Sequence, residues 1–152
     1  MKLSEALMNR ADYQKRLGLL KQRILNNAKV QEGDEPAEAI PTLLAQVDQL
    51  AGEYQRLLQQ INKTDIQTEF APGMTLTDVL AVRDVLALRR NLYQELANTA
   101  TLRQDRYTRN EVRFTTAVNV GEIQTQADRL AKEYRELDIK IQEVNWRTAL
   151  IE

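Results

Sequence analysis

The sequence predicts a mainly α-helical protein. We expect four long antiparallel helices, forming one bundle or paired helical hairpins, with a small β-hairpin and one extra short strand. Apolar residues recur at intervals of three and four along four stretches of the chain, Gly33 and Pro36 follow the first stretch, and the polar run Asn62–Asp65 ends the second. The length of 152 residues is typical of one domain. We therefore expect a single α-helical domain over residues 1–152.

The first two helices are predicted at about 3–28 and 42–62. Gly33 and Pro36 lie between them and cannot continue a helix. Gly18 and Gly52 fall near the middle of the two helices, which either permits close approach by another helix or marks neutral surface positions. The second helix carries a coiled-coil-like heptad pattern made by Leu43, Val47, Leu50, Tyr54, Leu57 and Ile61.

The third helix is predicted at about 76–103, after a hairpin at about 67–76 that turns at Pro72-Gly73. This helix is apolar on more than one face, whereas a surface helix normally has a single apolar stripe. A monomer would expose the surplus as a large apolar patch. We therefore expect the protein to associate with itself through this helix and through the faces of the first two helices that carry Gly18 and Gly52.

The region after the third helix changes character. Residues 111–118 are rich in β-forming side chains, which predicts a short strand that pairs across a subunit boundary. Asn119 is placed to cap a last helix at about 120–147.

The composition excludes several classes of site. The chain has no Cys and no His, so it has no disulfides, thiolate metal site, cysteine nucleophile or Ser-His-Asp triad. No pair of acids stands out as an acid and a base, so an enzyme is not favoured, and we expect no metal or cofactor. The net charge is −1, and we find neither a secretion signal nor a transmembrane segment, which predicts a cytoplasmic protein.

The predicted topology gathers polar residues at one end of the helices. The favoured interpretation is that the arginines there pair with nearby acids and fix the loops. The alternative is a nucleotide or RNA site at 103–113, because arginines suit phosphate and a tyrosine among them could stack on a base. The candidate residues are Asn26, Asn27, Gln31, Glu32, Arg103, Arg106, Tyr107 and Arg109.

A second polar group is expected at the opposite end. Two charged residues interrupt the most apolar part of the third helix, where an unpaired buried charge would be costly. They predict a hydrogen-bonded network that fixes the register of the helices, or alternatively a ligand pocket walled by a tryptophan. The residues are Asn62, Thr64, Arg83, Asp84, Asn145 and Trp146.

Five segments together resemble the septicolysin-like family of small bacterial proteins. They are NNAKVQEGDEP (26–36), INKTD (61–65), TLTDVLAVRDVL (75–86), RQDRYTRNEV (103–112) and EVNWRTALIE (143–152). The resemblance implies a soluble α-helical bacterial protein with no agreed activity, in a family whose name indicates a lysin.

Three functions remain open from the sequence. The favoured one is a homo-oligomeric helical protein that acts by interaction, its partner being a second copy of itself. The alternatives are a binder of a phosphate-containing ligand through Arg103–Arg113, and a membrane-active lysin as the family name suggests.

Overall fold

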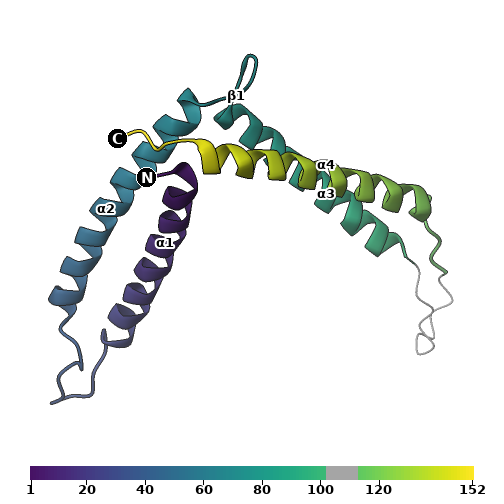
Figure 1. The fold of residues 1–152 in the computed structure, drawn as a ribbon. Coiled ribbons are helices and arrows are strands. Elements are labelled where there is room, and N and C mark those ends of the chain that lie inside the picture. The colour runs from purple at the N-terminus through teal and green to yellow at the C-terminus, as the bar shows by residue number, and fades with distance from the viewer. Residues whose placement is uncertain (102–112) are drawn as a thin grey trace. The chain divides into compact units, whose positions relative to one another are not determined.

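The computed structural model describes residues 1–101 and 113–152. The chain forms two compact units, one of Met1–Thr75 with Glu143–Glu152 and one of Leu76–Gln142. The described residues contain four long helices and a two-stranded antiparallel hairpin (Figure 1). The mainly α-helical fold class is thereby confirmed, while the single-domain organisation stays a prediction.

The first unit is built on helices α1 (Leu3–Asn26) and α2 (Ile40–Gln67), which lie side by side (Figure 1). They form a seam because their apolar residues repeat every three or four positions and so share one face. The predicted heptad residues Leu43, Leu50, Leu57 and Ile61 are all buried. The core of the seam is made by Leu20, Leu43 and Leu50, against which Tyr13, Leu17, Ile24 and Val47 pack.

Helix α2 continues past its expected end near residue 62. The Thr64 hydroxyl donates to the Gln60 carbonyl at 2.7 Å, and the Thr68 backbone N–H donates to the Thr64 carbonyl at 2.9 Å. The Thr64 hydroxyl thus finds a hydrogen-bond acceptor inside the helix. It therefore does not favour a turn that would end the helix. The motif INKTD therefore lies inside α2 rather than after it.

The predicted hairpin is present. Strand β1 (Glu69–Ala71) pairs with β2 (Met74–Thr75), with Glu69 opposite Thr75 and Ala71 opposite Met74. Gly73 has a φ of 75°, a left-handed conformation that favours glycine, and it closes the turn after Pro72.

The two ends of the chain complete the first unit. The Leu3 N–H donates to the Thr148 carbonyl and the Leu150 N–H donates to the Met1 carbonyl, both at 2.9 Å. These bonds make an antiparallel bridge between Lys2 and Ala149. The carboxyl-terminal segment is therefore held against the start of α1.

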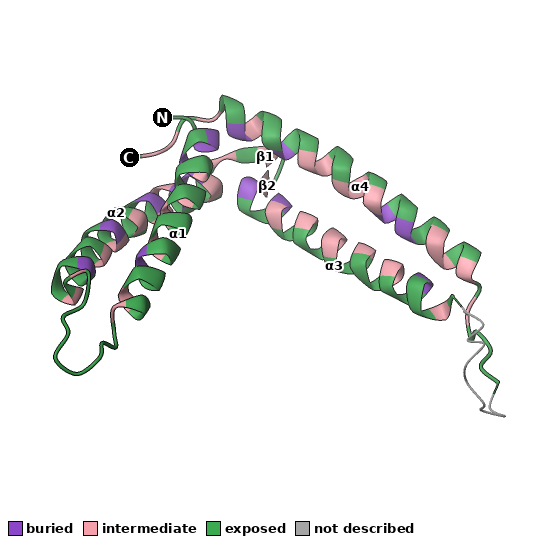
Figure 2. Cartoon of the chain, turned by 90° about the horizontal axis from the view of Figure 1, so that it is seen from below, coloured by how far each residue is buried: buried purple, intermediate pink, exposed green. Residues whose placement is uncertain are grey.

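The second unit consists of α3 (Leu76–Ala100) and most of α4 (Val120–Arg147). Figure 2 shows buried positions on both helices of this unit. Asn119 caps α4 as expected, because its side-chain oxygen accepts the Glu122 N–H at 3.1 Å. The buried apolar residues of the two helices are Leu76, Val79, Ala97, Ala127, Leu130 and Ile141.

The extra strand expected at 111–118 is not formed in its described part. Residues 113–118 have no strand structure, and residues 111–112 lie outside the described residues. The Thr116 hydroxyl donates to the Val118 carbonyl at 3.0 Å and accepts the Val118 N–H at 3.4 Å. This local turn occupies backbone groups that a strand would offer to a neighbour, so β propensity alone is overridden. Pairing of this segment across a subunit boundary involves a second copy of the chain and stays a prediction.

Candidate functional site

An exposed apolar stripe runs along α3. The residues repeat at intervals of three or four, which places them on one face of the helix. This face differs from the one that carries buried Leu76, Val79 and Ala97. The stripe consists of Val82 (43% exposed), Val85 (55%), Leu88 (66%), Leu92 (59%) and Leu96 (37%). The apolar character of α3 on two faces, expected from the sequence, is therefore present.

Polar contacts to α4 fix which face of α3 is turned outward. Arg83 donates to Asp138 at 2.7 Å, and both side chains are mostly buried. The Arg90 guanidinium lies 4.6 Å from the ring centre of Tyr134, within cation–π range. These contacts lie on the flank of α3 opposite the stripe, so they hold the stripe away from α4.

A third polar contact lies further along the same pair of helices. The side-chain amides of Gln94 and Gln124 donate to each other's oxygens at 3.2 and 3.1 Å. A reciprocal pair of this kind satisfies both side chains at once and fixes the register of α3 against α4.

Charged side chains border the stripe on α3. Asp84 precedes Leu88 by four residues and Glu95 follows Leu92 by three, so the two acids share one border. Arg89 follows Val85 by four residues and lies on the other border. All three are exposed, and none has an ion pair among the described residues. The stripe thus has one acidic and one basic border.

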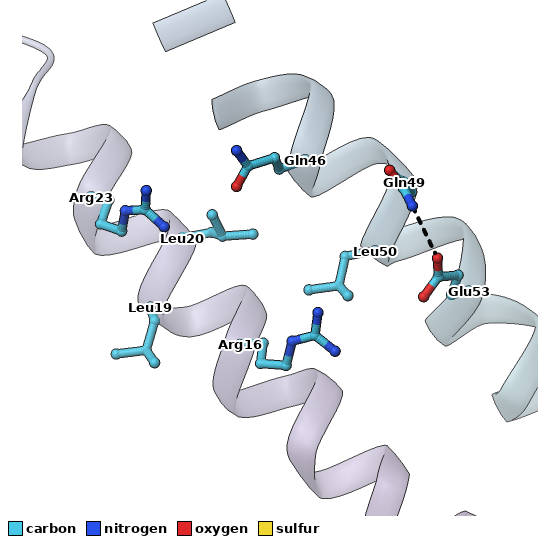
Figure 3. A pocket seen from close by; sticks show the side chains of 8 residues that line it. All are labelled: Arg16, Leu19, Leu20, Arg23, Gln46, Gln49, Leu50 and Glu53. Atoms are coloured by element: carbon cyan, nitrogen blue, oxygen red, sulfur yellow. Dashed lines mark hydrogen bonds between the residues drawn. The ribbon is translucent and has the colours of Figure 1, made fainter. Parts of the chain in front are cut away.

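A groove of about 320 Å³ lies between α1 and α2 (Figure 3). Leu20 and Leu50 belong to the buried seam and form its floor. Arg16 and Arg23 line the α1 side, together with Leu19, which is 57% exposed. The α2 side is lined by Gln46, Gln49 and Glu53. The groove therefore has an apolar floor, a basic rim and a rim of carbonyl and carboxylate oxygens.

One end of the groove is fixed by an ion pair between α1 and the loop before α2. Arg23 donates from Nε to a Glu38 oxygen at 3.1 Å and from Nη2 to the other oxygen. The hydrogen bonds from Arg23 hold the pKa of the Glu38 carboxyl below its usual value. Asn27 supports the same loop, because its amide donates to the Arg23 carbonyl at 2.8 Å and accepts the Glu38 N–H at 3.1 Å.

The other end of the groove is bounded by a tyrosine pair. The Tyr13 hydroxyl donates to Glu53 at 3.1 Å, and the rings of Tyr13 and Tyr54 have centres 6.0 Å apart. Burial, reinforced by the hydrogen bond to Glu53, raises the pKa of Tyr13. Glu53 also accepts from Gln49 at 3.3 Å, so it is held in place on the rim.

The first predicted polar group is only partly described. Asn27 anchors the loop, while Asn26, Gln31 and Glu32 are exposed. Arg103, Arg106, Tyr107 and Arg109 lie outside the described residues. The phosphate-binding hypothesis therefore stays a prediction of the sequence.

The second predicted polar group divides between the two units. Thr64 is fully buried and accepts the Ile151 N–H at 3.0 Å, Asn145 is buried, and Asn62 and Trp146 are exposed. These four belong to the first unit, and Arg83 and Asp84 belong to the second. Arg83 has a partner, Asp138, and Asp84 is exposed.

Several residues of the α1–α2 groove and of the contacts between α3 and α4 were not predicted from the sequence. Asp138, the partner of Arg83, was not singled out. Arg16, Arg23 and Glu53 were also missed, because on a helical wheel they look like ordinary solvated positions next to a seam.

The described residues contain no group of three or more acidic side chains that could hold a metal ion. In addition, none of the described helices combines the length and apolar character needed to cross a membrane.

Comparison with known proteins assigns the chain to a family without an assigned role. Residues 10–150 match the family of unknown function DUF6847, so the chain belongs to that family. It is also similar to a solved structure, described as a functionally unknown conserved protein from Corynebacterium diphtheriae. The two share 46% sequence identity over 99% of each chain, with a TM-score of 0.89. No curated protein matches.

The resemblance to the septicolysin-like family is wrong. The matching family and the matching structure both belong to proteins of unknown function. The five segments are each only five to twelve residues long, so each alone carries little information about the family. The lysin alternative rested on the family name alone and loses its basis.

Proposed function

We propose that this protein is a homo-oligomeric interaction protein, and that it associates through the exposed apolar stripe of α3. The observation that carries the proposal is the row of five exposed Val and Leu side chains, Val82, Val85, Leu88, Leu92 and Leu96. Single exposed apolar residues are normal on a protein surface, whereas a contiguous row of five marks a contact surface.

The polar contacts between α3 and α4 support the proposal. The Arg83–Asp138 pair, the stacking of Arg90 on Tyr134 and the Gln94–Gln124 pair hold α3 in one orientation. A surface that is held before binding loses less conformational entropy on association. Burying each Leu side chain contributes about 1.5–3 kcal/mol, which the loss of translational and rotational freedom on association offsets in part.

The experiment compares two matched double variants. Sedimentation velocity at tens of micromolar should show an oligomer for the native chain and a monomer for Leu88→Gln with Leu92→Gln. The control, Leu25→Gln with Leu44→Gln, changes two exposed leucines (56% and 47%) on α1 and α2 and should keep the oligomer. A native chain that sediments only as a monomer contradicts the proposal, as does loss of the oligomer in both double variants.

A further inference from the structure

The α1–α2 groove and the α3 stripe both carry exposed apolar side chains, and their charged borders include residues of opposite sign. Resting on the proposed function, we infer that the stripe of one copy docks into the groove of a second copy, with α3 antiparallel to α1 of the neighbour. The contact joins two different surfaces, the stripe and the groove, and every copy of the chain carries both.

The apolar parts of the two surfaces match. The groove has a floor of Leu20 and Leu50 and an exposed leucine, Leu19, on its α1 side. A helix packs by placing a ridge of side chains into the groove between ridges of its neighbour. The stripe of α3 is a ridge of this kind, with Leu88 and Leu92 as its most exposed members. A third helix over the seam would cover apolar surface on both sides.

The charged borders also match. The α1 rim of the groove presents Arg16 and Arg23, and the acidic border of the stripe presents Asp84 and Glu95. On the opposite side, the oxygens of Gln46, Gln49 and Glu53 can accept hydrogen bonds from Arg89.

Arg16 has capacity for a new partner. Its guanidinium lies 5.8 Å from the ring centre of Tyr13, and its ion pair with Asp12 spans 3.7 Å between two exposed side chains four residues apart on α1. Exposed pairs of this kind contribute little to stability. In contrast, Arg23 already holds Glu38 with two hydrogen bonds. Arg16 is therefore the better residue on which to test the contact.

The direction of the docked helix follows from the handedness of α-helices. Seen with its amino end up, α3 carries Asp84 and Glu95 to the right of the stripe. When the groove is viewed from outside the molecule with the amino end of α1 up, α1 forms its right side. When one surface is turned over to face the other, its left and right sides are exchanged. The two acids therefore meet α1 only if α3 runs antiparallel to it. Glu95 then lies near Arg16, and Asp84 lies near Arg23.

The spacing along the helices is compatible with these pairs. Arg16 and Arg23 are separated by about 10 Å and Asp84 and Glu95 by about 16 Å at the helical rise of 1.5 Å per residue. The long arginine side chains can span the difference of about 3 Å at each end.

The first experiment reverses charges across the contact. Arg16→Glu alone and Glu95→Arg alone should each raise the dissociation constant of the oligomer by roughly tenfold, and the two changes together should restore it. Lys21→Glu, an exposed residue on the other side of α1, is the matched control and should leave the constant unchanged. Circular dichroism verifies that each variant is folded.

The second experiment tests direction and uses the absence of cysteine in the native chain. A copy carrying Arg16→Cys, mixed with a copy carrying Glu95→Cys, should be joined by a short thiol cross-linker. A copy carrying Asp84→Cys should be joined to Arg16→Cys much less, because Asp84 lies three turns from Glu95.

The outcomes separate this inference from the proposed function. If Leu88→Gln with Leu92→Gln dissociates the oligomer while the charge reversals leave it unchanged, the stripe binds a different surface and the docking inference is overturned. Equal cross-linking of the Glu95 and Asp84 variants also overturns it. A native chain that is monomeric contradicts both the docking inference and the proposed function.

Discussion

The two helical pairs of this protein place their apolar residues differently. In the first unit the apolar faces of α1 and α2 meet each other, and Leu20, Leu43 and Leu50 are buried between helices that come into close contact. In the second unit α3 divides its apolar residues between an inner face and an outer stripe. Polar side chains such as Arg83 and Asp138 then link α3 to α4.

The difference between the two pairs shows which apolar residues of a helix are available for binding. An apolar residue that packs inside its own helical pair stabilises the fold, whereas one on the opposite face is free to contact another molecule. A helix with two apolar faces needs some other means of fixing its orientation. On α3, directional polar contacts supply it, because hydrogen bonds require a particular geometry while apolar contacts do not.

The largest expected effect contrasts a seam leucine with a stripe leucine. Leu50→Ala should lower the free energy of unfolding by about 2–5 kcal/mol, because it removes buried methyl groups and leaves a cavity. Leu88→Ala should change it by less than about 0.5 kcal/mol at concentrations where the chain is monomeric. Urea unfolding followed by circular dichroism gives both values, and equal losses would show that the comparison is mistaken.

An intermediate effect is expected from the Arg83–Asp138 pair. Arg83→Met should cost about 1–2 kcal/mol of the free energy of unfolding, because it leaves a mostly buried carboxylate without its partner. Arg129→Met is the control: it breaks an ion pair to Glu133 at 3.0 Å, but both side chains there are more exposed. That variant should lose less than about 0.5 kcal/mol. If the two variants lose the same amount, the pair does not orient α3 in the way described.

The smallest effect concerns Asp65 in the first unit. Burial raises the pKa of the Asp65 carboxyl above its ordinary value of 3.8, and the charge of Arg10 lowers it in part. The folded chain therefore holds this proton more tightly than the unfolded chain. As the pH rises from about 3.8 through the pKa of the folded state, this group makes stability fall, and the loss persists at neutral pH.

Asp65→Asn should accordingly raise the thermal midpoint slightly at pH 7 and remove this part of the pH dependence. Asp48→Asn, an exposed position on the same helix, should change neither. A lower midpoint for Asp65→Asn at pH 7 would mean that the attraction to Arg10 outweighs burial.

The local pattern was enough to predict where helices form and which of their faces are buried. Leu43, Leu50, Leu57 and Ile61 repeat at heptad spacing, and all four are buried. The Pro72-Gly73 turn and the cap at Asn119 were predictable for the same reason, since each depends on neighbouring residues only.

Contacts between distant parts of the chain were not predictable from the pattern. Arg83 was expected to have a partner, but the partner, Asp138, lies 55 residues away and its identity depends on the register between α3 and α4. The bond between Thr64 and Ile151 spans 87 residues. The periodicity of apolar residues shows which face of a helix is buried. It does not show how far the helix is shifted along its axis relative to its neighbour.

The strand expected near Val118 failed for a related reason. Strand propensity describes how a side chain fits beside a partner strand, and the described residues 113–118 have none. The Thr116 hydroxyl instead bonds to the backbone of Val118.

The closure of the first unit by the last ten residues has a consequence for the order of folding. The segment Leu76–Gln142 is continuous in sequence, so all the residues of the second unit leave the ribosome before the first unit is complete. Thr64 and the backbone of Met1 and Leu3 gain their carboxyl-terminal partners only when Thr148, Leu150 and Ile151 have been synthesised. Contacts of such long sequence separation form late and slowly. The seal of the first unit by its carboxyl-terminal segment therefore forms after the local contacts within α1 and within α2.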